Sequence, residues 1–207
     1  MSRGRKRPVA GRDEILDTAR TIGIRDGWKA VTIRAVASKL GYSSPLLYEH
    51  FHDKEDLLTQ IAFDALSLLQ AKLTVNLPKA NERRLEAMIN RYWRFMLENT
   101  QLYRLMNGMD GMLIDNEAVR SYAQSLCKFI AAELKPLAGK NATEADAMNL
   151  TEELWAFLHG MAALHLDRAI SFGLERVTRA GLRLVASTRN ERRQPLGNEK
   201  RKIICGS

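Results

Sequence analysis

Four side chains between residues 32 and 54 are of types that bind phosphate groups: Thr32, Tyr48, His50 and Lys54. Hydroxyl groups, cationic groups and the free amides at helix N-termini are the usual partners of nucleic-acid phosphates. Each also has a structural interpretation, because a threonine can cap a helix, a tyrosine can pack, a histidine can be a solvated surface group and a lysine can pair with a carboxylate. Together, on one surface, they favour DNA binding.

Residues 44–49 add side chains that can contact base edges. Ser44 can hydrogen-bond either kind of base, and Glu49 can accept from a cytosine amino group. Pro45 and Leu46 can contact thymine methyl groups. This segment contains no arginine, so affinity must come largely from phosphate contacts. The expected DNA-contacting residues of this region are Thr32, Arg34, Ser43, Ser44, Pro45, Leu46, Tyr48, Glu49, His50 and Lys54.

Other kinds of site find no support in the sequence. His159 and His165 are six residues apart, so they do not share a helix face as metal ligands four apart would. His50 and His52 are expected on opposite sides of one helix, and the two cysteines have no metal-ligand spacing. No phosphate-binding glycine loop, nucleophile elbow or dinucleotide-binding turn occurs. We therefore expect no enzyme activity, no metal and no cofactor.

The DNA-contacting residues fall on two short predicted helices. After the cap-type residue Thr32, apolar residues recur on one helical face at Ile33, Val36, Ala37 and Leu40. Gly41 suits the left-handed residue that ends this helix. Ser44 is then expected as the cap of the next helix and Pro45 as its first residue. Two short helices joined by a glycine-containing turn form a helix-turn-helix, whose second helix lies in the major groove.

Two flanking helices should hold this pair in place. One runs from about Asp13 to Asp26, with Gly27 as its stop, and the other runs from the cap Asp53 to about Lys72. The residues expected to be buried in this module, besides those above, are Ile15, Ala19, Ile22, Leu47, Phe51, Leu57, Ile61, Ala65, Leu68 and Leu69.

The rest of the chain repeats the helical spacing without a sustained alternating run, so the fold class is all-α. Further helices are expected near residues 81–99, 100–107, 115–135, 143–172 and 175–188. The expected organisation is a basic arm, a three-helix module with the helix-turn-helix, a larger helical domain and a basic polar tail, over residues 1–11, 12–72, 78–188 and 189–207.

The net charge of +8 is concentrated at the two ends of the chain. Residues 1–12 hold five basic and no acidic groups, and residues 187–207 hold six basic and two acidic groups. The charge of residues 13–186 is therefore −1, so DNA binding must depend on a few placed groups. Arg3 and Arg5, in an Arg-Gly-Arg sequence, are candidates for minor-groove contact; a tail with incidental charge is the alternative.

No apolar run in the sequence is long enough to cross a bilayer, and no apolar signal-peptide core follows the basic start. The sequence therefore predicts a cytoplasmic protein without a membrane partner.

The segment 33–58 resembles the TetR family of bacterial transcriptional regulators, and the likeness covers about residues 10–70. The residues at that family's turn glycine, core, phosphate-contacting positions and fourth-helix start are Gly41, Leu47, Tyr48, Phe51, Lys54, Leu57 and Leu58. Two residues depart from the family pattern. Gly23 replaces a bulky apolar residue, which bears on local packing, and Tyr42 replaces a small aliphatic one.

Trp155, His159 and Gly160 resemble the Trp-x-x-x-His-Gly signature of one C-terminal domain type among TetR-like regulators. The resemblance implies a helical ligand-binding and dimerisation domain, whose last two helices pack against their copies in a homodimer. Alternatively, the apolar residues of these helices are all buried within one subunit.

The resemblance also implies a pocket for a small-molecule effector. Methionine and aromatic side chains line adaptable apolar cavities, although the same residues are typical of an ordinary core. The candidate pocket residues are Trp93, Met96, Tyr103, Met106, Met109, Met112, Tyr122, Phe129, Trp155 and His159.

The expected function is a homodimeric repressor that binds a near-palindromic operator in double-stranded DNA and leaves it when a small molecule binds. An activator or a ligand-independent regulator is a near alternative. A more distant one is a helical ligand-binding protein or enzyme whose N-terminal module contacts another protein.

Overall fold

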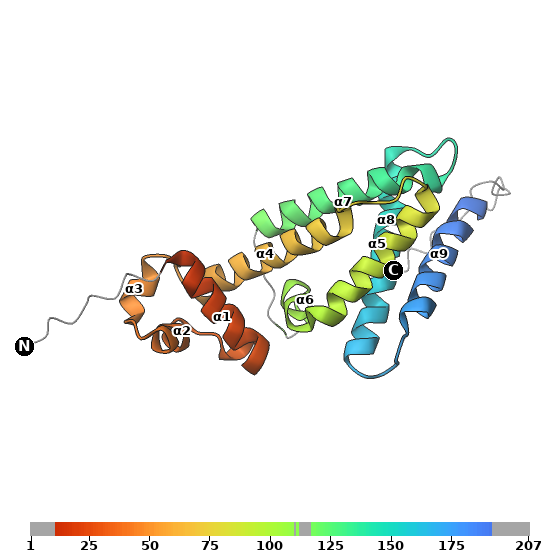
Figure 1. Ribbon diagram of the computed structural model, residues 1–207. Coiled ribbons are helices and arrows are strands. Elements are labelled where there is room, and N and C mark those ends of the chain that lie inside the picture. Colours follow the sequence, from red (N-terminus) through yellow and green to blue (C-terminus); the bar gives the residue numbers. More distant parts are fainter. Residues whose placement is uncertain (1–10, 110, 112–116, 192–207) are drawn as a thin grey trace, which may run out of the picture. The chain divides into compact units, whose positions relative to one another are not determined.

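The computed structural model describes residues 11–109, 111 and 117–191, with side chains as far as residue 188. All regular secondary structure in this part of the chain is helical, which confirms the all-α fold class (Figure 1). The elements are α1 (Arg12–Asp26), η1 (Trp28–Ala30), α2 (Ile33–Leu40), α3 (Ser44–Tyr48), α4 (Lys54–Thr74), α5 (Asn81–Glu98), α6 (Thr100–Met106), α7 (Glu117–Ala138), α8 (Glu144–Leu166) and α9 (Leu174–Glu191).

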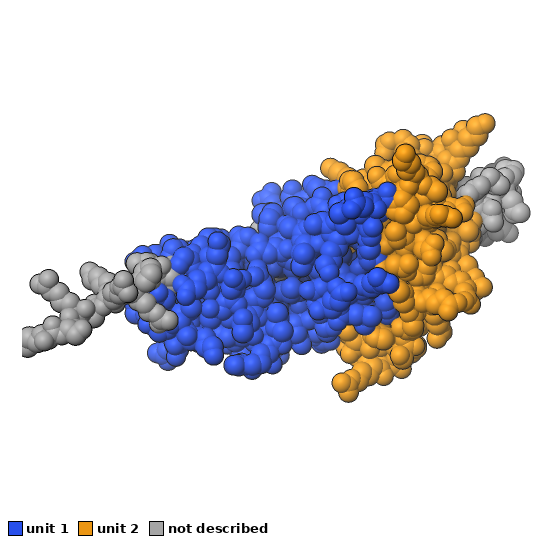
Figure 2. Space-filling view, in the orientation of Figure 1, with its two compact units in different colours: residues 1–77, 91–126 blue, residues 78–90, 127–207 orange. Residues whose placement is uncertain are grey.

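The chain forms two compact units, which Figure 2 shows in different colours. Unit 1 comprises residues 1–77 and 91–126, and unit 2 comprises residues 78–90 and 127–207. Unit 2 begins at residue 78. Each unit consists of two separate segments of the sequence, because the long helices α5 and α7 each contribute residues to both units.

A tryptophan explains the glycine in α1. Trp28 is buried, and its indole Nε1 donates to the Gln101 carbonyl oxygen at 2.7 Å. A Cβ atom at Gly23 would lie 2.1 Å from Cζ3 of this ring. The indole therefore fills the space that a bulky residue at position 23 would occupy, so this departure from the family pattern is compensated locally.

Helix α2 forms as predicted. The Ala35 amide donates to Thr32 Oγ1 at 3.0 Å, which makes Thr32 the N-cap. Gly41 ends the helix in the left-handed conformation at φ 74°. The four predicted apolar positions on its inner face are all buried. The Tyr42 amide donates to the Ala37 carbonyl at 2.9 Å, and the Tyr42 side chain packs against the core of this module.

Helix α3 ends before His50 and His52, so the prediction that both lie on one helix is wrong. Ser43, in extended conformation, is the residue before the helix, so Ser44 is the first helical residue rather than the cap and Pro45 the second. The helix ends at Tyr48, one turn after it begins. Phe51 lies beyond this end but is buried, as predicted.

Helix α4 begins as predicted, because the Asp53 carboxylate accepts from the Asp56 amide at 2.8 Å. Its buried face includes Leu57, Ile61, Ala65 and Leu69, each four residues from the last. Leu68 is 41% exposed, so its predicted burial is wrong. One residue corresponds to a rotation of about 100°, which turns position 68 away from the face that position 69 shares.

The later helices match their predicted ranges closely except for α8. The sequence predicted a helix to residue 172, but α8 ends at Leu166. Arg168 has a left-handed backbone at φ 58°, and the Phe172 amide donates to His165 Nδ1 at 3.1 Å. The His165 side chain, in the last turn of α8, thus stabilises the turn that follows the helix. No glycine or proline at the end of the helix indicates this turn in the sequence.

Replacing Gly23 with alanine tests the packing against Trp28. We expect Gly23→Ala to lower the free energy of unfolding by about 1–3 kcal/mol, the usual cost of overpacking a filled site. In a Trp28→Leu background the same alanine should cost much less, because the ring that it meets is gone. Urea denaturation of the four proteins measures this coupling, and an unchanged midpoint for Gly23→Ala alone would contradict it.

Candidate nucleic-acid interface

The helix-turn-helix lies on a closed apolar core within unit 1. The inner residues of α2, together with Leu47 of α3 and Phe51 after it, belong to one buried cluster with residues of α1 and α4. The turn itself is only Gly41, Tyr42 and Ser43. This packing places α2 and α3 next to each other with their outer faces open to solvent.

Most of the predicted contact residues are accessible. Tyr48, at the end of α3, is 55% exposed. The exposed members of the predicted set are Thr32, Arg34, Ser43, Pro45, Tyr48 and Glu49, and the half-buried members are Ser44, Leu46, His50 and Lys54. Arg3 and Arg5 lie outside the described residues. The accessible residues come from the N-terminus of α2, the turn and α3, all within unit 1.

Thr32 caps α2, and its contact with a phosphate stays a prediction. Its Oγ1 accepts the capping hydrogen bond from Ala35. Since a hydroxyl is one donor as well as an acceptor, its O–H proton remains available to a phosphate oxygen. The cap therefore orients the hydroxyl at the positive end of α2, where the helix dipole favours an anion.

Lys54 already makes one hydrogen bond within the protein. Its Nζ donates to the Lys29 carbonyl at 3.2 Å, which ties the start of α4 to η1. Burial lowers the pKa of this ammonium group. Two of its three N–H groups remain for other acceptors, so a phosphate contact stays a prediction for Lys54.

His50 is a restricted candidate. Its Nε2 is buried, and none of the residues that the structure describes hydrogen-bonds to it. A phosphate contact in this conformation would have to use Nδ1 instead. The backbone carbonyl of His50 accepts from the guanidinium of Arg12 at 3.0 Å.

Arg12 is the residue that sequence reasoning missed. The sequence analysis counts it only among the basic groups of residues 1–12 and assigns it no role, whereas the structure places it in the first turn of α1 with partners 38 and 48 residues away, at His50 and Gln60. No local sequence signal identifies such partners, because they depend on how α1 packs against α3 and α4.

The predicted pocket residues divide between the two units. Trp93, Met96 and Tyr103 are fully buried in unit 1. The Tyr92 and Tyr103 hydroxyl groups are 2.8 Å apart, and burial raises the pKa of the Tyr103 phenol. The half-buried members in unit 1 are Met106, Met109 and Tyr122, and those in unit 2 are Phe129 and His159. Trp155, also in unit 2, is exposed, and Met112 lies outside the described residues.

Helix α8 presents an outward face in unit 2. Trp155 is 48% exposed, and Ala156, Gly160 and Leu164 are exposed along the same helix. A Cβ atom at Gly160 would meet nothing within 4 Å. The rings of Trp155 and His159 lie 6.5 Å apart between centroids, and burial lowers the pKa of His159. This face can accept another helix at close range.

The described part of the chain contains no group of three or more residues suited to hold a metal ion. Burial, followed by the charge of Glu152, raises the pKa of the Cys127 thiol, which makes it a poor nucleophile at neutral pH. Among the helices that the structure describes, none has the length and apolar character to cross a membrane.

Two family models match the chain. The model described as "Bacterial regulatory proteins, tetR family" matches residues 15–61. The model described as "Tetracyclin repressor-like, C-terminal domain" matches residues 85–187. The first match contains α2, α3 and the start of α4, and the second contains α6 to α8 and most of α9.

Two named proteins are similar in sequence to part of this chain. The HTH-type transcriptional repressor KstR2 of Mycolicibacterium smegmatis is 39% identical over 62 residues, which are 30% of each chain. The nucleoid occlusion factor SlmA of Shewanella sp. W3-18-1 is 32% identical over 131 residues, or 62% of this chain and 66% of SlmA. Both alignments thus span less than two thirds of the relative.

A solved structure of a protein of unknown function from Rhodococcus sp. RHA1 has a TM-score of 0.73 to this fold. It is 20% identical, and the alignment covers 88% of this chain and 98% of that protein. At this level of identity the likeness shows a shared fold over nearly the whole of the other chain.

Proposed function

The chain belongs to the TetR family of bacterial regulatory proteins and is a DNA-binding transcriptional regulator, and we propose that it represses transcription from a near-palindromic operator. The observation that carries this proposal is the helix-turn-helix of α2 and α3, capped by Thr32 and turned at Gly41, with Tyr48 exposed on the second helix. The repressor KstR2, which is 39% identical to this chain over 62 residues, supports the direction of regulation.

In this proposal α3 enters the major groove, and the groups around it bind the phosphates on both sides. Thr32 with the α2 amides, Tyr48 and Lys54 supply the phosphate contacts. The outer residues of α3, from Ser44 to Glu49, face the base edges. Arg34, Ser43 and His50 add to this surface, and Arg3 and Arg5 are proposed to reach the minor groove.

We also propose that the protein acts as a homodimer through α8 and α9. Alanine and glycine on the outward face of α8 permit close approach of a second helix, and Trp155 and Leu164 supply apolar area beside them. The sequence Trp155-x-x-x-His159-Gly160 lies on this face. A twofold dimer presents two copies of α3 to successive major grooves, roughly one helical turn or about 34 Å apart.

Release from the operator is proposed to follow small-molecule binding in the helical region beyond residue 78. Buried Trp93, Met96 and Tyr103 are of types that line adaptable apolar pockets. The buried pair of Tyr92 and Tyr103 hydroxyls would give such a pocket a polar feature. An activator or a ligand-independent regulator remains the alternative.

Operator binding should depend on Tyr48. Because this side chain is exposed, Tyr48→Ala should leave the melting temperature unchanged while weakening binding to a specific fragment about tenfold, the scale of one hydrogen bond to a charged group. Mobility shifts with fragments from upstream of the protein's own gene measure this effect. Ile24→Ala in α1, where the side chain is 51% exposed, is the control and should bind normally.

If no upstream fragment forms a specific complex, and neither Tyr48→Ala nor Lys54→Ala changes binding to any DNA, the N-terminal module is better explained as a protein-contact module.

Dimer formation should depend on Gly160. We expect Gly160→Glu to convert the dimer to a folded monomer, because glutamate is a better helix former than glycine but places a charge on the outward face of α8. Sedimentation velocity measures the change. Ala132→Glu adds the same group to an exposed position of α7 in unit 2 and should remain dimeric. A dimeric Gly160→Glu protein would place the interface elsewhere.

Effector binding should stabilise the protein and weaken operator binding together. At a ligand concentration one hundred times the Kd, the expected stabilisation is about 2.7 kcal/mol. A thermal-shift screen of small metabolites, followed by operator titrations with each stabilising compound, tests the linkage. If stabilising compounds all leave operator affinity unchanged or increase it, the inducer part of the proposal is wrong.

A further inference from the structure

We propose that Arg12 is a positioning residue for DNA recognition, which holds the C-terminal end of α3 in register with α4. The proposal rests on the function proposed for α3 above. Arg12 lies in the first turn of α1 and would act through the backbone of His50 and the side chain of Gln60, rather than by binding a phosphate itself.

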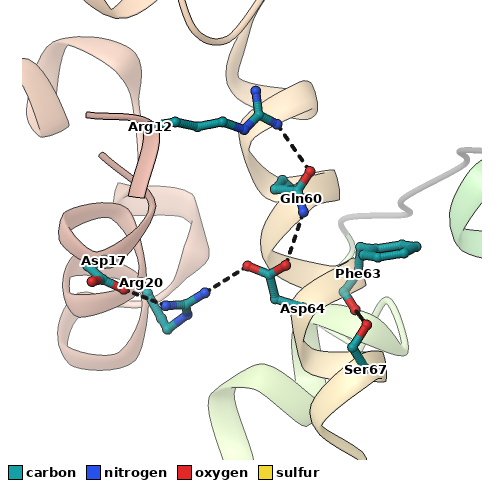
Figure 3. Close-up of polar contacts among 7 residues, drawn as sticks. All are labelled: Arg12, Asp17, Arg20, Gln60, Phe63, Asp64 and Ser67. Atoms are coloured by element: carbon teal, nitrogen blue, oxygen red, sulfur yellow. Dashed lines mark hydrogen bonds and ion pairs between the residues drawn. The ribbon is translucent and has the colours of Figure 1, made fainter. Parts of the chain in front are cut away.

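The guanidinium of Arg12 contacts three residues at once. Its Nη1 donates to the His50 carbonyl at 3.0 Å, two residues after the end of α3. Its Nη2 donates to Gln60 Oε1 on α4 at 3.1 Å, a contact drawn in Figure 3. Its Cζ atom lies 4.4 Å from the centre of the Phe51 ring. One planar, rigid group therefore joins His50 and Phe51, which follow α3, to Gln60 on the side of α4.

The end of α3 gains support from this contact. A five-residue helix is a single turn and is not stable by itself, and the Leu47 carbonyl near its end already accepts from the His50 and Phe51 amides. The His50 carbonyl, two residues after the helix, accepts from Arg12 instead. The N-terminal end of α3 is set by the turn at Gly41. Arg12 supplies a charged donor at the other end, so the direction of the helix axis is held from both sides.

A polar chain keeps the Gln60 acceptor oriented. Gln60 Nε2 donates to Asp64 Oδ1 at 3.0 Å, which leaves Oε1 facing Arg12. Asp64 Oδ2 in turn accepts from Arg20 Nη2 at 3.0 Å, and Arg20 Nη1 is 2.6 Å from Asp17 Oδ1. Figure 3 shows this chain running between α1 and α4. Helix α1 is thus tied to α4 at two points, Arg12 and Arg20.

Arg12 is exposed and follows a basic segment in the sequence, so a direct phosphate contact is the alternative to its positioning role. The salt dependence of DNA binding distinguishes these two roles. A residue that binds phosphate contributes equally to specific and non-specific binding, and its loss lowers the slope of log K against log salt by about one. A residue that positions α3 affects base readout, so its loss reduces operator affinity relative to non-specific DNA without changing the slope.

The experiment compares the wild type with Arg12→Met, Gln60→Ala and the double variant, using the full chain. Operator fragment and a shuffled duplex of the same length are titrated over a range of salt concentrations. Tyr48→Ala is included in the same assay, so a failure of the proposed function is seen independently. Arg25→Met is the control for charge, because it removes a cation from α1 whose ion-pair partner is the adjacent Asp26.

We expect Arg12→Met to weaken operator binding about tenfold, with non-specific affinity and the salt slope unchanged. Gln60→Ala should act in the same direction although the Arg12 charge is intact. The double variant should be no worse than Arg12→Met, because the Arg12–Gln60 contact that Gln60→Ala removes is already lost in Arg12→Met. If Arg12→Met does not fold, Gln60→Ala decides alone.

The proposal is overturned if Arg12→Met weakens both DNAs equally with a lower slope while Gln60→Ala binds normally. It is also overturned if both variants keep the wild-type ratio of specific to non-specific affinity, whatever their melting temperatures. Loss of melting temperature without loss of that ratio identifies a purely structural contact.

Discussion

A helix of five residues cannot maintain its own geometry in water, so the position of α3 depends on the apolar core beneath it. Leu47 from α3 and Phe51 just after it are both buried in the cluster that α1, α2 and α4 share. This burial leaves only one face of α3 for solvent. The DNA-reading surface is therefore a consequence of core packing, and the exposed residues on it are free to vary in chemistry without changing the fold.

The features that sequence predicted are those with local causes. The Thr32 cap, the left-handed Gly41 and the Asp53 cap each depend on residues within four positions, and all three are as expected. The end of α8 and the fit of Trp28 against Gly23 were not predicted. The first depends on the His165 side chain, which accepts from the Phe172 amide, and the second on the Trp28 ring, which packs against Gly23. The spacing of apolar residues along the sequence does not indicate such contacts.

The same distinction applies to the site. Residue type and helix geometry were enough to place Pro45 and Glu49 away from the core, and both are exposed. They could not reveal that Lys54 donates to a carbonyl 25 residues away, or that Arg12 reaches His50. A cation's sequence neighbours say little about its partners, because long side chains select acceptors from whatever the packing brings near.

Helix α4 is where the two proposed activities meet within unit 1. On one side, Gln60 and Asp64 bind the arginines of α1. On another, the Phe63 ring lies 4.8 Å from that of Tyr122, a predicted pocket residue, whose hydroxyl donates to Gln70. A ligand that displaces Tyr122 would therefore act first on α4. Because Gln60 is on the same helix, a shift of α4 would also change the acceptor that Arg12 uses to hold α3. Only a difference in ligand affinity between the two positions of α4 would make this coupling regulatory.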